Sequence, residues 1–373
     1  MSRSLRIAYD ARLAIGEYRG MGRFLRQLIA GRERDFIGLC ADGEQDRSLA
    51  LIASGSRPYP LWEQISLPSV LRKQKVDVFL APYNTAPLHL PANLKLVLVV
   101  HDLIFMEKLP LSRSLYQNSG RLYRKLVVPT AVRHADRLVT VSHFTARELV
   151  SQFGIRQERI RVIHNSISEV WFNEQSIVVP AERYVLMVAG EAPSKNLARA
   201  IRAFAQCRDL EKDLGLRLKV VGVKSAFHHV FQNVAQECGA AGQIDFLGYI
   251  PDSELRSLYR NAALFVMPSL SEGFGIPVLE AMASGVPVAA SGRTSLPEIG
   301  GDAALYFDPE LIEQMANIMH EILSTPSLRD RMSESGRAQA RKFHPSRIRL
   351  DIDAFWSELD TTFSAQKDKA VTQ

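Results

Sequence analysis

An apolar run that stops at a glycine-bearing loop and then leads into a helix is the feature that most restricts the fold of this chain. Residues 262–267 are apolar and end at Pro268, which is typical of a buried strand that runs into a loop. Pro277 supplies the fixed φ that suits the first turn of a helix, and the good helix formers after it end at Gly285. The sequence therefore predicts a strand, a loop and a helix in succession.

Two glutamates flank the glycines of this loop. Glu272 lies in the loop, and Glu280 follows eight positions later in the expected helix. In a parallel sheet the carboxyl ends of the strands face the ligand crevice, into which the next helix points its unpaired N–H groups and its positive dipole end. A diphosphate suits that position, with one carboxylate near a sugar and the other near a ribose. Two ordinary surface glutamates are the alternative, but the Gly-Phe-Gly segment between them favours the functional interpretation.

This stretch resembles the retaining glycosyltransferases of family 4, which have the two-domain GT-B fold. The resemblance covers nearly the whole chain, and the E-x7-E motif is its most specific part. It implies that Glu272 contacts the donor hexose and that Glu280 binds the ribose hydroxyls. It also implies that the backbone amides of Phe274, Gly275 and Ile276 touch the sugar and the phosphate.

The remaining apolar runs predict an α/β fold with doubly wound parallel sheets. Together with the resemblance, they indicate two Rossmann-like domains that face a cleft. Residues 1–170 would bind the acceptor and residues 171–343 the nucleotide sugar, with a linker at 166–182. Residues 344–373 would form a helix that packs back on the first domain, followed by a polar, disordered tail from Ser364. Strands are expected at 7–9, 36–39, 76–80, 94–100, 137–141, 160–163, 184–189, 216–221, 244–247 and 302–309.

Gly20 and Gly22 follow the first expected strand and open a helix. Leu25 stands where a third glycine would complete the dinucleotide fingerprint, and this disfavours an enzyme that uses a nicotinamide cofactor. The resemblance implies that the loop lies over the acceptor and the donor phosphate, so both glycines are candidates for donor binding. A simple turn is the alternative.

His101 follows the strand expected at 94–100. At that position it can bond a sugar hydroxyl or the donor phosphate, and a purely structural histidine is the alternative. The resemblance implies that His101 lies nearest the reacting centre, with Asp102 and Ser142 on the acceptor side. Thr145 is expected to cap the helix that follows Ser142.

A second glycine loop follows the strand expected at 184–189. It contains Gly190 and leads to Lys195 and Asn196 just before a helix. A lysine there is placed to neutralise a phosphate as a point charge, and a solvated loop lysine is the alternative. Members of the family commonly have an arginine before this lysine, but this chain has Ser194. Lys195 would then contact the diphosphate alone or with help from Arg199.

The sequence predicts catalysis without a metal ion or another cofactor. It contains no D-x-D in a suitable loop and no His, Asp and Glu cluster with the spacing of metal ligands. Lys195 and the helix end would offset the charge that grows on the leaving phosphate. Glu272 would contact the donor sugar, either by stabilising an oxocarbenium-like transition state or by covalent attack. The resemblance places Gly248 and Tyr249 beside the base, and both guanine and uracil stay open.

Charge is distributed unevenly along the chain. Residues 1–173 contain 25 Lys and Arg against 15 Asp and Glu, whereas residues 174–373 contain 21 against 25. The basic half suits an anionic lipid surface, a phosphorylated acceptor or nucleic acid, and the absence of a nucleic-acid motif favours the first two. Residues 111–134 mix basic and apolar side chains as helices in a membrane interface do, although a surface helix with one core face is the alternative.

No run of about 18 apolar residues and no apolar leader is present, and the three cysteines lack ligand spacing. We therefore expect a cytoplasmic protein, peripheral at the inner face of the cytoplasmic membrane. The predicted function is transfer of a hexose, mannose or glucose, from a GDP- or UDP-linked donor to a saccharide or lipid-linked saccharide in cell-surface polysaccharide synthesis. The alternatives are a nucleotide-sugar epimerase or a glycan phosphorylase of the same fold, a nicotinamide-dependent Rossmann oxidoreductase, and an inactive nucleotide-binding subunit.

Overall fold

The computed structural model describes residues 5–16, 20–55, 57–108, 110, 115–172, 183–211 and 215–371, with the backbone alone at 116, 211 and 366–371. Most of the expected linker, residues 173–182, lies outside the described residues. The chain divides into two compact units. The first unit comprises residues 1–107, 114–166 and 346–373, and the second comprises residues 108–113 and 167–345.

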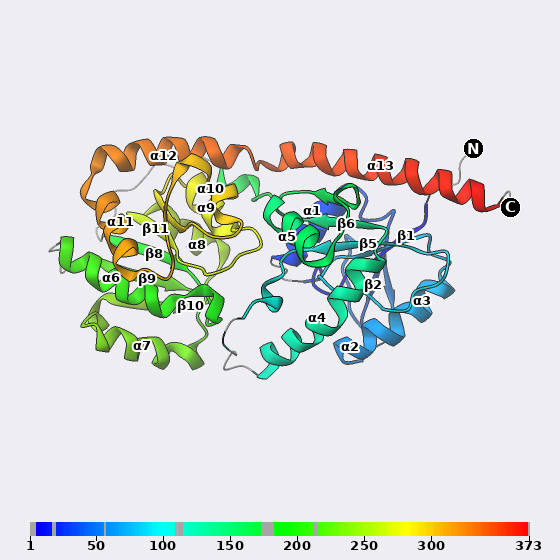
Figure 1. Cartoon of the computed structure of the whole chain (residues 1–373), viewed down its shortest axis with the longest axis horizontal. Helices are drawn as coiled ribbons and strands as arrows, with labels where there is room; N and C mark the ends of the chain where they lie inside the picture. The colour runs from blue at the N-terminus through cyan, green and yellow to red at the C-terminus, as the bar shows by residue number, and fades with distance from the viewer. Residues whose placement is uncertain are drawn as a thin grey trace. The chain divides into compact units, whose positions relative to one another are not determined.

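The first unit is built on a seven-stranded parallel sheet with the order β3-β2-β1-β4-β5-β6-β7 (Figure 1). The chain builds outward from β1 in one direction and from β4 in the other, so the topological switch point lies between these two strands. Ligands of open parallel sheets bind outside the carboxyl ends of the strands at such a point. The strands are β1 (Ile7–Asp10), β2 (Ile37–Cys40), β3 (Leu51–Ala53), β4 (Val78–Ala81), β5 (Lys95–Val100), β6 (Arg137–Thr140) and β7 (Ile160–Val162).

Helices cover this sheet, and their apolar faces share a core with β1, β4 and β5. The α-helices are α1 (Met21–Ile29), α2 (Tyr59–Leu61), α3 (Leu67–Lys73), α4 (Leu115–His134), α5 (His143–Phe153) and α13 (Pro345–Val371). Between α2 and α3 the chain forms a π-helix, η1 (Trp62–Ser66), and short 3₁₀ turns are η2 (Ile104–Met106) and η3 (Gln157–Arg159).

The C-terminal helix α13 packs on the first unit, as predicted (Figure 1). The fully buried Trp356 donates from Nε1 to the carbonyl oxygen of Leu28 at 2.8 Å, and its ring meets Phe36 at a centroid distance of 4.8 Å. Arg349 donates to the carbonyl oxygen of Ala30 at 2.5 Å. The expected disordered tail from Ser364 is wrong, because α13 continues to its end at residue 371.

The second unit contains a six-stranded parallel sheet with the order β10-β9-β8-β11-β12-β13, and its switch point lies between β8 and β11. The strands are β8 (Tyr184–Val188), β9 (Arg217–Val221), β10 (Ile244–Gly248), β11 (Leu264–Met267), β12 (Val288–Ser291) and β13 (Ala304–Phe307). The α-helices are α6 (Leu197–Glu211), α7 (His228–Glu237), α8 (Asp252–Arg260), α9 (Ile276–Ala283), α10 (Leu296–Gly300), α11 (Ile312–Ser324) and α12 (Pro326–Arg341). The 3₁₀ turns are η4 (Glu169–Trp171), η5 (Pro193–Lys195), η6 (Ser225–Phe227), η7 (Ala241–Gln243) and η8 (Gly301–Ala303).

The α/β fold with two parallel Rossmann-like sheets is thus confirmed, but the predicted cap of α5 is wrong. Helix α5 is capped by Ser142 and not by Thr145, since the Ser142 hydroxyl accepts from the backbone N–H of Thr145 at 3.2 Å. Helix α8 begins at Asp252, with Pro251 in the cap position.

Candidate functional site

The loop between β11 and α9 holds a conformation that requires glycine at one position. Gly275 precedes α9 with φ of 114°, and a Cβ atom there would lie 2.7 Å from Cδ2 of Leu296. The Ser295 hydroxyl donates to the carbonyl oxygens of Glu272 and Phe274 at 3.0 and 2.8 Å. Ser295 and Leu296, at the start of α10, therefore hold the loop in one conformation. This also fixes the direction in which the unpaired N–H groups of the first turn of α9 point.

Lys195 and Glu272 meet at the switch point of the second sheet. Lys195 follows β8 and Glu272 follows β11, and these adjacent strands place Lys195 Nζ 2.6 Å from Glu272 Oε1. The Ser269 hydroxyl donates to the same oxygen at 2.7 Å. The two side chains are 30% and 12% exposed, so both polar ends can reach a ligand. The structure thus brings together two of the three residues predicted to be catalytic.

Asn196 ties the two loops together. It adopts the left-handed conformation with φ of 56°, and its Nδ2 donates to the carbonyl oxygens of Pro268 and Pro309 at 3.0 and 2.7 Å. Its side chain is 7% exposed. Asn196 is therefore a residue that positions the site, and its amide group is already committed to these carbonyls.

A second residue with unusual backbone geometry supports Glu272. Thr294 has φ of 59°, although it is β-branched, and its hydroxyl accepts from the backbone N–H of Glu272 at 3.1 Å. Such strain in a side chain of this shape is concentrated at functional sites. The sequence analysis did not select Thr294, since nothing local distinguishes it from other loop residues.

Glu280 lies on α9 and is 5% exposed. The hydroxyl of the fully buried Tyr259 donates to Glu280 Oε2 at 3.2 Å. Burial raises the pKa of Tyr259 well above its usual value, and the nearby charge of Glu280 raises it further. The phenol therefore stays protonated and holds the carboxylate of Glu280 in one orientation.

The other residues predicted to bind the donor fall into two groups. The Phe274 side chain is buried and packs edge-to-face on Phe343 at 5.9 Å, so its backbone is the part left for a ligand. Contact of the Phe274 and Ile276 amides with the donor stays a prediction. Gly190, Gly248 and Tyr249 stand at the carboxyl ends of β8 and β10, two strands apart in the sheet, and Tyr249 is 58% exposed.

Arg199 was suggested as a second contact to the diphosphate beside Lys195, but in the structure it bonds a neighbouring side chain. Its guanidinium donates to Asn196 Oδ1 at 3.1 Å. It also lines a groove of about 530 Å³ in the second unit, together with Glu191 and Arg202. Neither Lys195 nor Glu272 lines this groove, although the neighbouring residues Asn196 and Leu270 do.

His101, the third residue predicted to be catalytic, lies at the end of β5 in the first unit and is 8% exposed. Its Nε2 lies 2.8 Å from the carbonyl oxygen of Pro82, and Phe24 packs edge-to-face on the ring. Burial lowers the pKa of His101 to about 4, so the ring is neutral at pH 7. A carbonyl can only accept, so Nε2 carries the proton and Nδ1 is an acceptor. Such a ring suits a sugar hydroxyl better than a phosphate.

The other residues of the first unit that were predicted to belong to the site lie at turns and helix ends, where the structure shows contacts with the backbone. Gly20 precedes α1 with φ of 45° and Gly22 is buried in that helix, while residues 17–19 of the loop lie outside the described residues. Asp102 Oδ1 accepts from the backbone N–H of Ile104 at 3.1 Å. Ser142 is buried as the cap of α5.

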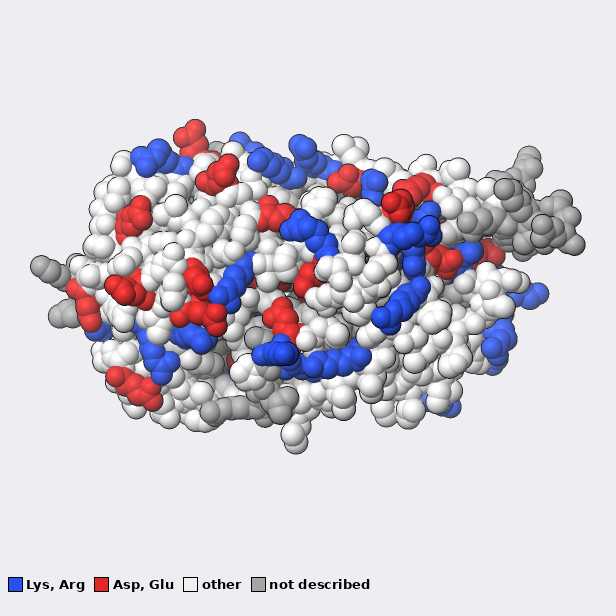
Figure 2. Space-filling view, in the orientation of Figure 1, with Lys and Arg blue, Asp and Glu red and all other residues white. Residues whose placement is uncertain are grey.

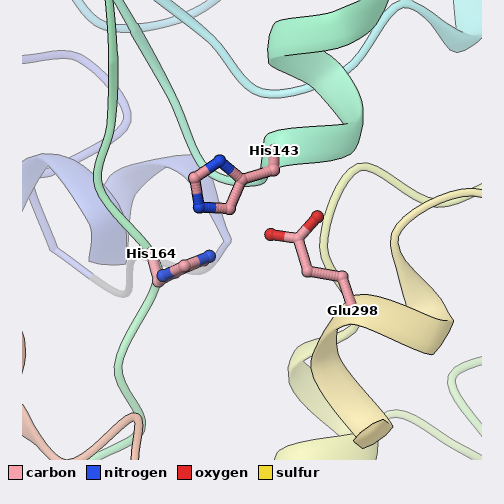
Figure 3. A group of neighbouring side chains, drawn as sticks. All are labelled: His143, His164 and Glu298. Atoms are coloured by element: carbon pink, nitrogen blue, oxygen red, sulfur yellow. The ribbon is translucent and has the colours of Figure 1, made fainter.

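Figure 3 draws two further histidines of the first unit, which the sequence analysis did not select as site residues. His143 begins α5 and His164 follows β7, and their rings lie edge-to-face with centroids 5.6 Å apart. Glu298 in the same figure comes from α10 of the second unit. Imidazole is a common metal ligand, and the metal independence expected from the sequence stays a prediction.

Two family models match adjoining parts of the chain. Glycosyltransferase Family 4 matches residues 26–169, and Glycosyl transferases group 1 matches residues 171–339. The chain belongs to the family 4 glycosyltransferases. The second match contains Lys195, Glu272 and Glu280, and the first contains His101.

Several curated relatives of this glycosyltransferase are named for transfer of mannose, and others are named D-inositol 3-phosphate glycosyltransferases. O-antigen chain mannosyltransferase B of Escherichia coli is 32% identical over 218 residues, which are 56% of this chain and 57% of that protein. MMP alpha-(1->4)-mannosyltransferase of Mycolicibacterium hassiacum is 27% identical over 211 residues, 56% of this chain and 50% of the relative. The chain spans about half the length of the curated relatives it matches.

Solved structures show the same fold at low identity. Sucrose-phosphate synthase of Thermosynechococcus elongatus matches with a TM-score of 0.75 at 18% identity, over 95% of this chain and 99% of that one. The HepE protein of Anabaena, crystallised with UDP-glucose, matches with a TM-score of 0.75 at 19% identity, over 95% of this chain and 100% of the other. They support the GT-B fold that the resemblance implied.

Proposed function

We propose that this glycosyltransferase moves a hexose from a nucleotide diphosphate sugar to a hydroxyl of a saccharide or lipid-linked saccharide in cell-surface polysaccharide synthesis. The observation that carries the proposal is the Lys195–Glu272 pair at the switch point of the second sheet, next to the first turn of α9. A cation, a carboxylate and a ring of N–H groups at one point suit a sugar joined to a diphosphate.

Each residue of the second unit then has a separate task. The first turn of α9 and Lys195 stabilise the negative charge that collects on the diphosphate when the glycosidic bond breaks. Glu272 bonds the hexose and stabilises positive charge at its anomeric carbon. Glu280, oriented by Tyr259, accepts from the ribose hydroxyls. Because α9 and Lys195 supply the positive charge, the proposed reaction needs no metal ion.

Retention of the anomeric configuration is part of the proposal. The acceptor hydroxyl attacks from the face that the diphosphate leaves, and the leaving phosphate oxygen takes the proton of that hydroxyl. His101 of the first unit accepts from a substrate hydroxyl through Nδ1, because its Nε2 proton is held by Pro82. The names of the relatives favour mannose as the hexose. The solved HepE complex contains UDP-glucose, so both GDP and UDP donors are to be tested.

We also propose that the first unit touches an anionic membrane at the inner face of the cytoplasmic membrane. Helix α4 exposes Leu115, Leu122 and Leu126 to 86%, 60% and 68%, on a helix that also carries Arg124 and Lys125. Exposed leucines beside basic side chains suit a lipid interface. On the face drawn in Figure 2, most of the visible acidic side chains lie over the second unit. None of the described helices is long and apolar enough to cross a membrane.

Thermal-shift binding of UDP, GDP and ADP to the wild type and to Glu280→Ala, with and without EDTA, tests the donor site. The expected result is stabilisation by one nucleotide, insensitivity to EDTA and loss of the effect in Glu280→Ala. Turnover of GDP-mannose and UDP-glucose, with NMR of the product anomer, then tests hexose transfer and retention. If the wild type binds none of the three nucleotides, the assignment of the second unit is wrong.

A further inference from the structure

The groove that Arg199 lines has no role in the function proposed so far. Its volume of about 530 Å³ lies within the range of pockets that hold small molecules. The lining combines apolar side chains, among them Pro193, Leu270 and Phe231, with charged ones, and all of its residues belong to the second unit. Such a lining, apolar with a few charged groups, is typical of a site for a small ligand.

Both carboxylates of the lining already have a cation of their own. Glu191 Oε1 lies 3.2 Å from Lys224 Nζ, and Glu310 Oε2 lies 2.6 Å from Arg293 Nη2. Neither Lys224 nor Arg293 lines the groove. The negative charge of the lining is therefore offset from outside the groove, and the cations that line it are left for a ligand.

Three cations line the groove. Arg199 and Arg202 lie three positions apart on α6, so their side chains share one face of the helix. Arg199 bonds the neutral amide oxygen of Asn196 at 3.1 Å, and neither Arg199 nor Lys108 has an ion-pair partner among the described residues. Arg202 pairs with Glu237 at 3.0 Å, but these side chains are 39% and 63% exposed, and exposed pairs are weak. The groove therefore carries positive charge that the surrounding side chains do not neutralise.

The groove lies beside the pair that is proposed to bind the donor. In the sequence Asn196 of its lining follows Lys195, and Leu270 precedes Glu272 by two positions. The backbone N–H of Leu270 donates to the carbonyl oxygen of Ser194 at 2.7 Å, so the loops that carry the pair are bonded to each other at the groove. A ligand in the groove is therefore next to the site proposed for the hexose.

The charges of the groove favour a phosphate over a carboxylate. A phosphate monoester carries about two negative charges at pH 7, which match the two cations without a carboxylate partner, Lys108 and Arg199. Arginine also pairs with phosphate through two parallel N–H bonds. The groove is larger than a phosphate needs, and its apolar side chains suit the carbon face of a sugar ring.

We propose that this groove binds a phosphorylated sugar of the acceptor, with the phosphate held by Arg199 and Lys108. The same chemistry occurs in a free sugar phosphate and in a sugar joined to a lipid through a diphosphate. The inference rests on the proposed hexose transfer and adds that the acceptor carries a phosphate. It also gives the second unit a part in binding the acceptor.

Titration calorimetry of the full chain tests the proposal. The nucleotide that stabilises the wild type is present at saturation, so that the donor site is occupied, and each titration is repeated without nucleotide. Mannose 6-phosphate and a farnesyl-diphosphate-linked N-acetylglucosamine represent the two sources of phosphate, and methyl α-mannoside and glucuronate are the neutral and carboxylate probes. The variants are Arg199→Met, Arg199→Lys and Lys108→Met. The matched control is Arg337→Met on α12, since Arg337 is also half-buried but does not line the groove.

The expected result is that at least one phosphorylated probe binds the nucleotide-saturated wild type more tightly than methyl α-mannoside and glucuronate do. Its affinity should fall about tenfold in Arg199→Met and in Lys108→Met, because each loses one charged hydrogen bond. Arg199→Lys should restore most of the affinity, and Arg337→Met should not change it. The phosphorylated probe that binds more tightly identifies the source of the phosphate.

Absence of binding by both phosphorylated probes, tighter binding of glucuronate, or equal affinity in the wild type and Arg199→Met would overturn the inference. Displacement of the nucleotide by a phosphorylated probe, or loss of nucleotide binding in Arg199→Met, would assign Arg199 to the donor diphosphate and overturn it as well. Melting temperatures of all variants identify losses that come from unfolding. If the wild type binds no nucleotide, the proposed function fails, and the titrations without nucleotide still decide whether the groove binds phosphate.

Discussion

Lys195 is expected to change its partner when a nucleotide diphosphate binds. In the structure its Nζ lies 2.6 Å from Glu272 Oε1, and its side chain is 30% exposed, so it can turn toward a phosphate without leaving a buried position. A hydrogen bond between charged groups contributes about 1.5–3 kcal/mol. Since about 1.4 kcal/mol is a tenfold change in affinity, Lys195→Met should weaken nucleotide binding by roughly 10- to 100-fold.

Glu272→Gln should not weaken nucleotide binding. The amide oxygen still accepts from Lys195, but the competing charge is gone, so the nucleotide should bind with unchanged or higher affinity. Lys224→Met is the control, because Lys224 also pairs with a glutamate of the second unit, Glu191 at 3.2 Å, but is 70% exposed. Titration calorimetry with the nucleotide that stabilises the wild type measures all three. Wild-type affinity in Lys195→Met would show that the lysine only holds Glu272 in place, and the reasoning would be refuted.

Four further outcomes follow from the structure. His101 has a pKa of about 4 in the folded state and about 6.5 in the unfolded state, so the unfolded state binds a proton first as the pH falls. The free energy of unfolding should therefore fall by about 3 kcal/mol from pH 6.5 to pH 4. A titration of the His101 ring followed by NMR should have its midpoint near pH 4 and not near pH 6.5. Gly275→Ala should cost about 1–3 kcal/mol and abolish nucleotide binding, because φ of 114° and the contact with α10 exclude a Cβ; an unchanged melting temperature would contradict this. Trp356→Ala should destabilise the first unit by about 3–5 kcal/mol. Trp356→Phe, which loses the N–H donor and part of the ring but keeps an aromatic side chain, should cost less, about 1–3 kcal/mol, as measured by hydrogen exchange of α1. Replacing both Leu122 and Leu126 by serine should reduce co-sedimentation with vesicles that contain anionic lipid, while nucleotide binding stays unchanged; equal sedimentation of the wild type and the double variant would refute the membrane proposal.

Much of the fold could be predicted because its signals are local. The strand, glycine loop and helix from β11 to α9 follow from an apolar run, a glycine and a proline that restrict their own backbone. Strand β3 was not predicted, since it has three residues and none of them is buried. The cap of α5 was placed at the wrong residue because Ser142 and Thr145 are both good caps, and the hydrogen bond between them exists only after the helix has formed.

The sequence by itself determined which residue types follow each strand, and therefore which side chains can stand at the carboxyl edge of a sheet. The tertiary structure decided which of them meet. Lys195 and Glu272 are 77 positions apart, and they pair because β8 and β11 are neighbours in the sheet. Glu63 looks like an ordinary helix glutamate until Tyr59, Thr85 and Tyr123 converge on it from three segments. Backbone preferences depend on adjacent residues, whereas such convergence depends on the order of the strands and on burial.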